Sequence, residues 1–198
     1  MSGKQTTNTP GSKLETIKEI FRDSCAIREK ILSDGLILDK IEQAAEMLLA
    51  CVKQGGTIYA CGNGGSSNDA MHLVEELVAR YKRERPGIKA MHFMDAAVLT
   101  CWSNDYSFDG VFERQVQTFC NKNDVLLALS TSGNSLNVVK AVNACKKSGT
   151  KTIALLGKDG GELSKIADLS IIAPSNQTER IQEVHITIIH IFCELLET

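Results

Sequence analysis

The chain has 198 residues, which suits one compact domain with a core of its own. It carries 22 Lys and Arg against 24 Asp and Glu, a net charge of −2, so nucleic acid is not expected as its main ligand. No stretch approaches the roughly 18 apolar residues that span a bilayer, and the first residues lack the apolar core of a signal peptide. Seven cysteines without a C-x-x-C pair fit reduced, mostly buried thiols. We therefore expect a cytoplasmic protein that is not bound to a membrane.

The first part of the chain precedes the sheet. Residues 1–12 are polar and predict a disordered lead-in, followed by a single domain over residues 13–198. Apolar side chains recur at helical spacing over residues 14–32 and 36–52, which predicts two long helices. An amphipathic helix ahead of a complete α/β core often meets a partner subunit, so we expect an oligomer. The alternative is that both helices pack only on the sheet of their own chain.

After these helices, short β-like runs alternate with helical patterns. The predicted strands cover residues 57–61, 89–93, 125–130, 152–156 and 169–173. The predicted helices cover residues 69–81, 96–101 with 111–119, 135–147, 162–166 and 178–196. This alternation predicts an α/β fold, a three-layer αβα sandwich with a five-stranded parallel sheet of flavodoxin-like type and extra N-terminal helices.

A hydroxyl-rich turn lies between the third predicted strand and its helix. Residues 130–135 read Ser-Thr-Ser-Gly-Asn-Ser. The first turn of a helix offers unpaired N–H groups and a positive dipole end, which favour a phosphate or carboxylate. The hydroxyls add donors, and Gly133 lets the backbone approach a ligand. The alternative is that Ser135 only caps its helix while the other hydroxyls form a local turn.

A second turn of this kind follows the first predicted strand, where residues 62–67 read Gly-Asn-Gly-Gly-Ser-Ser. Ligands of open parallel sheets bind beyond the carboxyl ends of the strands, where both turns lie. Two such turns suggest the two ends of one ligand, or one well-wrapped phosphate. The glycine-rich turn at residues 157–161 is expected to serve chain geometry rather than binding.

Several polar side chains could carry chemistry. His72 and Glu76 are spaced i, i+4, so they emerge on one face of a helix. On the last helix Gln182 and His190 share a broad face, and Glu179 lies near His190 in angle. Nitrogen and oxygen ligands of this kind suit zinc. The simpler alternative is a hydrogen-bonded His–Glu pair on the surface or at an interface.

The other two histidines are interpreted as structural. His185 lies next to the apolar stripe of the last helix, and His92 lies inside a predicted strand, as a core or edge residue.

Several stretches resemble, in the same order, the phosphoheptose isomerases, which belong to the sugar-isomerase (SIS) phosphosugar-binding fold. They are residues 61–77, 104–105, 130–135, 157–161 and 180–185 with His190. The likeness extends from about Leu36 to Leu196. It implies aldose–ketose isomerisation of sedoheptulose 7-phosphate to D-glycero-D-manno-heptose 7-phosphate through an enediolate, in nucleotide-heptose biosynthesis. The product's destination, lipopolysaccharide, a capsule or a glycoprotein, stays open.

The resemblance also implies roles for matching residues. Glu76 matches the catalytic base and His190 its partner acid/base. The implied zinc ligands are His72, Glu76, Gln182 and His190. The implied substrate contacts are Asn63, Gly64, Gly65, Ser66, Arg80, Asn104, Asp105, Ser130, Thr131, Ser132, Ser135, Glu179 and Gln182. The family forms homotetramers with sites built between subunits.

One position departs from the family pattern. Glu179 stands where the family often has an aspartate, so it is expected as a helper rather than a catalytic residue. Two other functions are weighed: a non-catalytic SIS protein that binds a phosphosugar or a replication initiator, and an isomerase for another sugar phosphate. The presence of His72, Glu76 and His190 favours an enzyme over the first, and the single domain disfavours the second.

Overall fold

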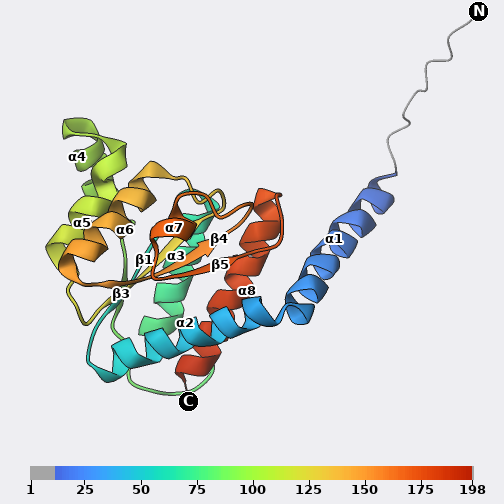
Figure 1. Cartoon of the computed structure of the whole chain (residues 1–198), viewed down its shortest axis with the longest axis horizontal. Coiled ribbons are helices and arrows are strands. Elements are labelled where there is room, and N and C mark those ends of the chain that lie inside the picture. Colours follow the sequence, from blue (N-terminus) through green and yellow to red (C-terminus); the bar gives the residue numbers. More distant parts are fainter. Residues whose placement is uncertain (1–11, 198) are drawn as a thin grey trace, which may run out of the picture.

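A five-stranded parallel sheet lies at the centre of the computed structural model, which describes residues 12–197 (Figure 1). The strands are β1 (Ile58–Cys61), β2 (Ala90–His92), β3 (Val125–Ser130), β4 (Lys151–Leu156) and β5 (Leu169–Ile172). Their order is β2-β1-β3-β4-β5, the order of flavodoxin-like sheets, in which the direction of winding reverses between β1 and β3. The predicted α/β class and five-stranded parallel sheet are confirmed.

Helices cover both faces of this sheet. One face carries α2 (Gly35–Lys53), α3 (Gly65–Val78) and α8 (Thr178–Leu196). The other carries α4 (Ala96–Asp105), η1 (Phe108–Gly110), α5 (Val111–Phe119), α6 (Leu136–Ser148) and α7 (Leu163–Ile166). Successive side chains of a strand point to opposite faces, so Ile58 and Ala60 join the first core while Tyr59 and Cys61 join the second.

The middle of the sheet is buried on both faces. All residues of β1 and β3 are buried, which explains why these strands read as continuous apolar runs. Leu127 of β3 pairs with Ala60 on one side and with Ile153 on the other. The hydroxyl-rich turns therefore follow the two most buried, neighbouring strands, on either side of the reversal point.

Three helix boundaries differ from the sequence prediction by more than one residue. The helix predicted to end at residue 81 ends at Val78. The helix predicted from residue 69 begins at Gly65, because Ser66 and Ser67 already donate first-turn bonds to the carbonyls of Asn63 and Gly64. The helix predicted to end at residue 101 continues to Asp105. No residue of α4 (Ala96–Asp105) is buried, so its second half lacks the apolar periodicity that marks a helix in a sequence.

The first helix, α1 (Lys13–Ser33), extends away from the sheet (Figure 1). Ile27 is its buried residue, while its apolar side chains Leu14, Ile17, Ile20 and Phe21 are exposed. The lead-in predicted for residues 1–12 lies outside the described residues, apart from Ser12, whose hydroxyl accepts the N–H of Glu15. None of the helices within residues 12–197 is long and apolar enough to cross a lipid bilayer.

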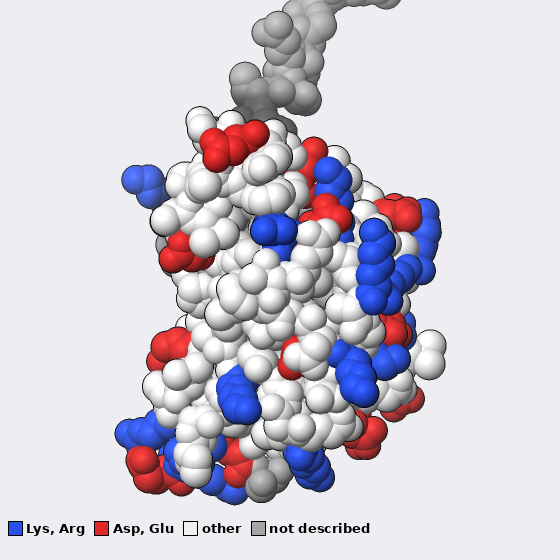
Figure 2. All heavy atoms as spheres, turned by 90° about the vertical axis from the view of Figure 1, so that its left-hand side faces the viewer, with Lys and Arg blue, Asp and Glu red and all other residues white. Residues whose placement is uncertain are grey.

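The face that α4 and α5 present is mixed in charge. Figure 2 shows Lys and Arg interspersed there with Asp and Glu, around a broad uncharged area. Exposed apolar side chains of this layer include Val98, Tyr106, Phe108 and Phe119.

Candidate active site

The serine turn, residues 130–135, joins the end of β3 to the start of α6. The Ser130 hydroxyl lies 3.0 Å from the Ser135 hydroxyl and accepts the N–H of Gly133 at 3.1 Å. Ser135 is the N-cap residue of α6, yet its side chain makes no capping bond within this described helix. The Ser132 hydroxyl does form a local turn, since it accepts the N–H of Asn134. The capping alternative is therefore wrong for Ser135, and the local-turn alternative holds for Ser130 and Ser132.

The glycine-rich turn at residues 157–161 packs directly against the serine turn. Gly133 has a φ of +67°, and a Cβ there would stand 2.0 Å from the carbonyl oxygen of Gly160. The N–H of Leu163 donates to the carbonyl of Gly133, and the N–H of Glu162 donates to the side chain of Asn134, each at 2.9 Å. These contacts give residues 157–161 the geometric role expected for them.

The two hydroxyl-rich turns are joined to one another. The Asn63 side chain donates to the Asn137 carboxamide oxygen at 2.8 Å and accepts from its amide at 2.9 Å. Asn137 is buried in the first turn of α6, and Ser66 is buried in the first turn of α3. Asn137 was not predicted as a site residue, because its burial and its bond to Asn63 are visible only in the structure.

Three side chains converge from α3 and α8. His72 Nε2 lies 3.0 Å from His190 Nε2 and 3.4 Å from Glu76 Oε1. One ligand atom from each of the three residues lies within 4.8 Å of the others. We call these residues the triad. The convergence of a carboxylate from the third helix with an imidazole from the last one is found here within a single chain.

The geometry and chemistry of the triad fit a divalent metal ion. Two ligands about 2.1 Å from a tetrahedral zinc ion are roughly 3.4 Å apart, close to the 3.0 and 3.4 Å measured here. Two imidazoles and a carboxylate are also the donor types that zinc prefers. A hydrogen bond between the two imidazoles would give a similar separation, so the geometry permits both arrangements.

Two residues next to the triad, Asp69 and Tyr81, were not predicted as site residues. Asp69 precedes His72 by one turn of α3, and its Oδ2 is buried without a hydrogen-bond partner among the described residues. Burial raises the pKa of Asp69 to about 6, and His72 partly offsets that rise. The i, i+3, i+7 spacing of Asp69, His72 and Glu76 was a readable signal. Tyr81 stacks on His190, with ring centroids 5.8 Å apart, and no sequence pattern announces that contact.

The Gln182 side chain lies beside the turn at residues 62–67, at the start of α3, rather than beside the triad. A Cβ at Gly65 would stand 2.4 Å from the Gln182 amide nitrogen, so a larger residue at position 65 would displace the Gln182 side chain. His72 follows Gly65 by roughly 10 Å along α3. This position suits the predicted contact with substrate better than the predicted coordination of zinc. Both assignments of Gln182 stay predictions.

Other predicted site residues lie apart from the triad in one chain. Arg80 is exposed and lies 4.0 Å from the still more exposed Glu84. Asn104 and Asp105 bond to each other at the end of α4, in the opposite layer from α8. Glu179 is exposed in the first turn of α8. Gly64 precedes α3 on the surface, while Thr131 is half-buried in the serine turn.

The remaining histidines are structural, as interpreted. The Nε2–H of the fully buried His185 donates to the carbonyl of Leu156 at 2.9 Å. His92 lies on β2, at the edge of the sheet, and its Nδ1 accepts the N–H of Met94.

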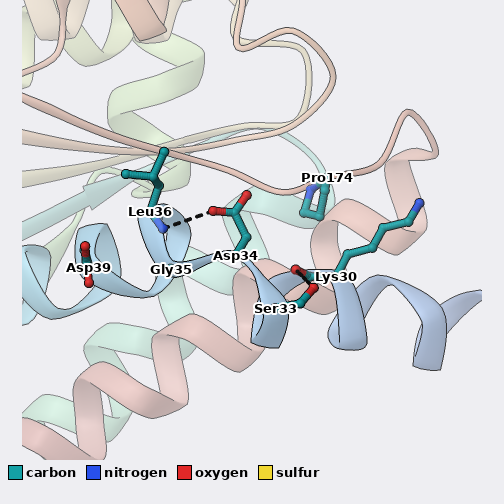
Figure 3. A pocket seen from close by; sticks show the side chains of 7 residues that line it. All are labelled: Lys30, Ser33, Asp34, Gly35, Leu36, Asp39 and Pro174. Carbon is teal, nitrogen blue, oxygen red and sulfur yellow. Dashed lines mark hydrogen bonds between the residues drawn. The ribbon is translucent and has the colours of Figure 1, made fainter.

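A hollow of about 690 Å³ lies away from the triad, beside the turn between α1 and α2 (Figure 3). Asp34 caps α2 there by accepting the N–H of Leu36 at 3.0 Å, and Ser33 donates to the carbonyl of Lys30. Asp34 and Ser33 are thus paired within the chain, and the cluster of potential metal ligands found among the described residues is the triad rather than the lining of this hollow.

Comparison with known proteins agrees with this fold. The family model for the SIS domain matches residues 21–157. The chain is therefore a SIS-domain protein.

Longer matches narrow the family. A phosphoheptose isomerase of Vibrio cholerae is 47% identical over 184 residues, which cover 92% of this chain and 96% of that protein. The structure of phosphoheptose isomerase GmhA from Neisseria gonorrhoeae aligns with a TM-score of 0.87 at 36% identity, covering 93% of this chain and 98% of that chain. A phosphoheptose isomerase from Francisella tularensis gives 0.90 at 32% identity, covering 94% and 98%. The chain belongs to the phosphoheptose isomerase family.

Proposed function

We propose that this protein is a cytoplasmic aldose–ketose isomerase that converts sedoheptulose 7-phosphate to D-glycero-D-manno-heptose 7-phosphate, a step of heptose biosynthesis. The observation that carries the proposal is the convergence of Glu76, His72 and His190 within 4.8 Å. A non-catalytic phosphosugar-binding protein has no need of such a triad. The names of the relatives indicate a phosphoheptose substrate, and the family resemblance supplies sedoheptulose 7-phosphate in particular.

The reaction moves a proton between neighbouring carbons through an enediolate. Because a carbon next to a carbonyl is a weak acid, the site needs a positioned base and a group that stabilises the developing oxyanion. Glu76 takes the proton from one carbon and returns it to the next. Because a carboxylate bound to zinc is a poorer base, this role requires that Glu76 hold the ion only loosely or that the substrate displace it. His190, on the facing helix, donates and accepts protons at the sugar oxygens.

The metal ion proposed for the triad is zinc. The residues of this chain that would hold it are His72, Glu76 and His190, with Gln182 as the further ligand that the family resemblance implies. A bound zinc ion supplies Lewis-acid polarisation of the substrate carbonyl.

The serine turn holds the phosphate. Its hydroxyls and the first N–H groups of α6 are the donors, and Asn63 and Ser66 of the neighbouring turn contact the sugar. Ser66 lies roughly 9 Å before His72 along α3, so a ligand bound between the turns and the triad must be an elongated molecule. A seven-carbon sugar phosphate has that shape, and binding its remote phosphate helps to orient the reacting carbons.

The decisive test is incubation of the purified protein with sedoheptulose 7-phosphate and detection of an aldoheptose phosphate by mass spectrometry. Glu76→Gln should lower the rate by roughly 10²- to 10⁴-fold, as expected for loss of a general base. Glu75→Gln is the matched control, because Glu75 is the adjacent carboxylate but is exposed on another face of α3. Turnover by Glu76→Gln at the unmodified rate would reject Glu76 as the base.

A further inference from the structure

The segment between α3 and β2 is held in place by a carboxylate that follows the last helix. Glu197 accepts the main-chain N–H groups of Tyr81, Lys82 and Arg83 at 3.1, 3.0 and 3.0 Å. Its side chain is only 2% exposed. Burial raises the pKa of Glu197, but these N–H groups and Arg85 outweigh it and keep that pKa below its ordinary value. Three main-chain donors on one carboxylate fix the path of the segment.

Arg85 ties the same carboxylate to the end of α3. Its Nε lies 3.2 Å from Glu197 Oε1. Its guanidinium also donates to the carbonyls of Glu76 and Leu77, each at 2.9 Å. These carbonyls belong to the last turn of α3, where intrahelical partners run out. The ends of α3 and α8, the two helices that carry the triad, are therefore joined through one ion pair whose side chains are 13% and 2% exposed.

Tyr81 connects the segment held by Glu197 to the triad, because its side chain contacts His190. Its ring stacks on the His190 imidazole at 5.8 Å with an interplanar angle of 23°. The His72 ring meets the same imidazole edge-on, with centroids 5.1 Å apart. The orientation of His190 thus depends on a ring whose backbone is held by Glu197.

We propose that Glu197 is a positioning residue for His190, acting through Tyr81. It holds the main chain of residues 81–83 so that the Tyr81 ring sets the plane of the imidazole toward His72 and the substrate. The inference rests on the proposed role of His190 in isomerisation. A displacement near 1 Å at a reacting group can cost on the order of 10²-fold in rate, so a distant clamp of this kind affects catalysis.

The kinetic test compares two carboxylates that hold the same segment. Glu197→Gln keeps the size of the side chain but places an amide donor against main-chain donors. Glu194→Gln is the control, because the half-exposed Glu194 pairs with the side chain of Lys82 and with no main-chain group of residues 81–83. We expect kcat to fall roughly tenfold in Glu197→Gln with KM within about twofold, and neither to change in Glu194→Gln. Equal kcat in wild type and Glu197→Gln would overturn the proposal.

A second readout does not require turnover. The ring protons of His190 are followed by NMR in the intact protein with labelled histidine, assigned with the His190→Gln variant. Their shifts should move in Tyr81→Leu and Glu197→Gln and stay in Tyr81→Phe, which keeps the aromatic ring. If the wild-type protein fails to isomerise, the proposed function fails while these shifts still decide the positioning. His190 shifts that are unchanged in a folded Glu197→Gln protein would overturn it.

Discussion

His185 and His190 lie on the same helix, yet their surroundings assign them different tasks. His185 is enclosed by the core, and its Nδ1 is buried without a partner among the described residues. Burial lowers the pKa of His185 to about 4, with the bond to Leu156 acting in the opposite direction. His190 lies on the half-exposed side, next to His72, where a ligand can reach it.

The buried histidine predicts acid sensitivity. The pKa of His185 is about 4 in the folded protein and about 6.5 in an unfolded chain. The unfolded state therefore binds more protons between these values. Stability from neutral His185 is complete above pH 6.5 and is lost as the pH falls toward 4, up to about 3 kcal/mol in total. Asp69, whose pKa is raised, acts in the opposite direction over part of this range.

Urea unfolding at several pH values checks this expectation. His185→Gln places an amide donor near the position of Nε2, facing the Leu156 carbonyl, but cannot titrate. Wild type should lose up to about 1.4 kcal/mol per pH unit more than the variant over this range. The comparison cancels the contribution of Asp69, which both proteins share. Parallel pH curves for the two proteins would contradict the buried neutral histidine.

The triad also predicts how much zinc the protein binds. Because His72 contacts both other members of the triad, His72→Asn should lower bound zinc from about one ion per chain to near zero, measured by mass spectrometry of the intact protein. His92→Asn is the control, since His92 lies on β2. Zinc retained at full stoichiometry in His72→Asn, or absent from wild type, would favour the hydrogen-bonded arrangement instead.

The conformation of the serine turn depends on its contact with the glycine-rich turn at residues 157–161. Gly133 has the left-handed backbone that favours glycine, and its missing Cβ leaves room for the Gly160 carbonyl. Gly133→Ala should therefore destabilise the fold by about 2 kcal/mol and raise KM by displacing the phosphate donors. Gly35→Ala is the control, because a Cβ there meets nothing within 4 Å. The free energy of unfolding in urea and KM should both change in Gly133→Ala, and neither should change in Gly35→Ala. A Gly133→Ala protein with unchanged stability and KM would show that residues 157–161 do not hold the serine turn in place.

The sequence predicts the repeating elements well for a physical reason. Buried parallel strands and amphipathic helices carry a period of hydrophobicity, so β1, β3 and β4 were placed within one residue of their observed limits. Helix ends made of polar residues carry no such period. The end of α4 and the start of α3 were misplaced for that reason.

In the site as well, periodicity predicted some residues, and contacts between distant segments were missed. His72 and Glu76 could be paired from helical spacing alone, because one helix presents both. The contact of Tyr81 with His190, and the clamp of Glu197, join segments far apart in the chain through a loop without periodicity. Only the packing of α3 against α8 brings them together. The interaction of Asn63 with Asn137 depends likewise on the neighbouring positions of β1 and β3.

For the whole molecule, the predicted site residues fall into two groups. The triad lies between α3 and α8, whereas Asn104 and Asp105 lie at the end of α4 in the opposite layer. The exposed apolar side chains of α1 and of the α4–α5 layer offer surfaces for another copy of the chain. We therefore expect the homotetramer implied by the family resemblance, with Asn104 and Asp105 supplied to the site by a neighbouring subunit.

Subunit mixing tests this arrangement. Glu76→Gln and Asp105→Asn should each be nearly inactive alone, yet mixed tetramers refolded together should regain up to roughly a quarter of wild-type activity, because some sites receive both intact residues. Mixing Glu76→Gln with His190→Gln is the control. The triad is assembled within one chain, so every triad in that mixture carries a defect and activity should stay low. Light scattering should give the mass of four chains. Failure of the first mixture to regain activity while tetramers form would place the Asp105 side chain outside the shared site.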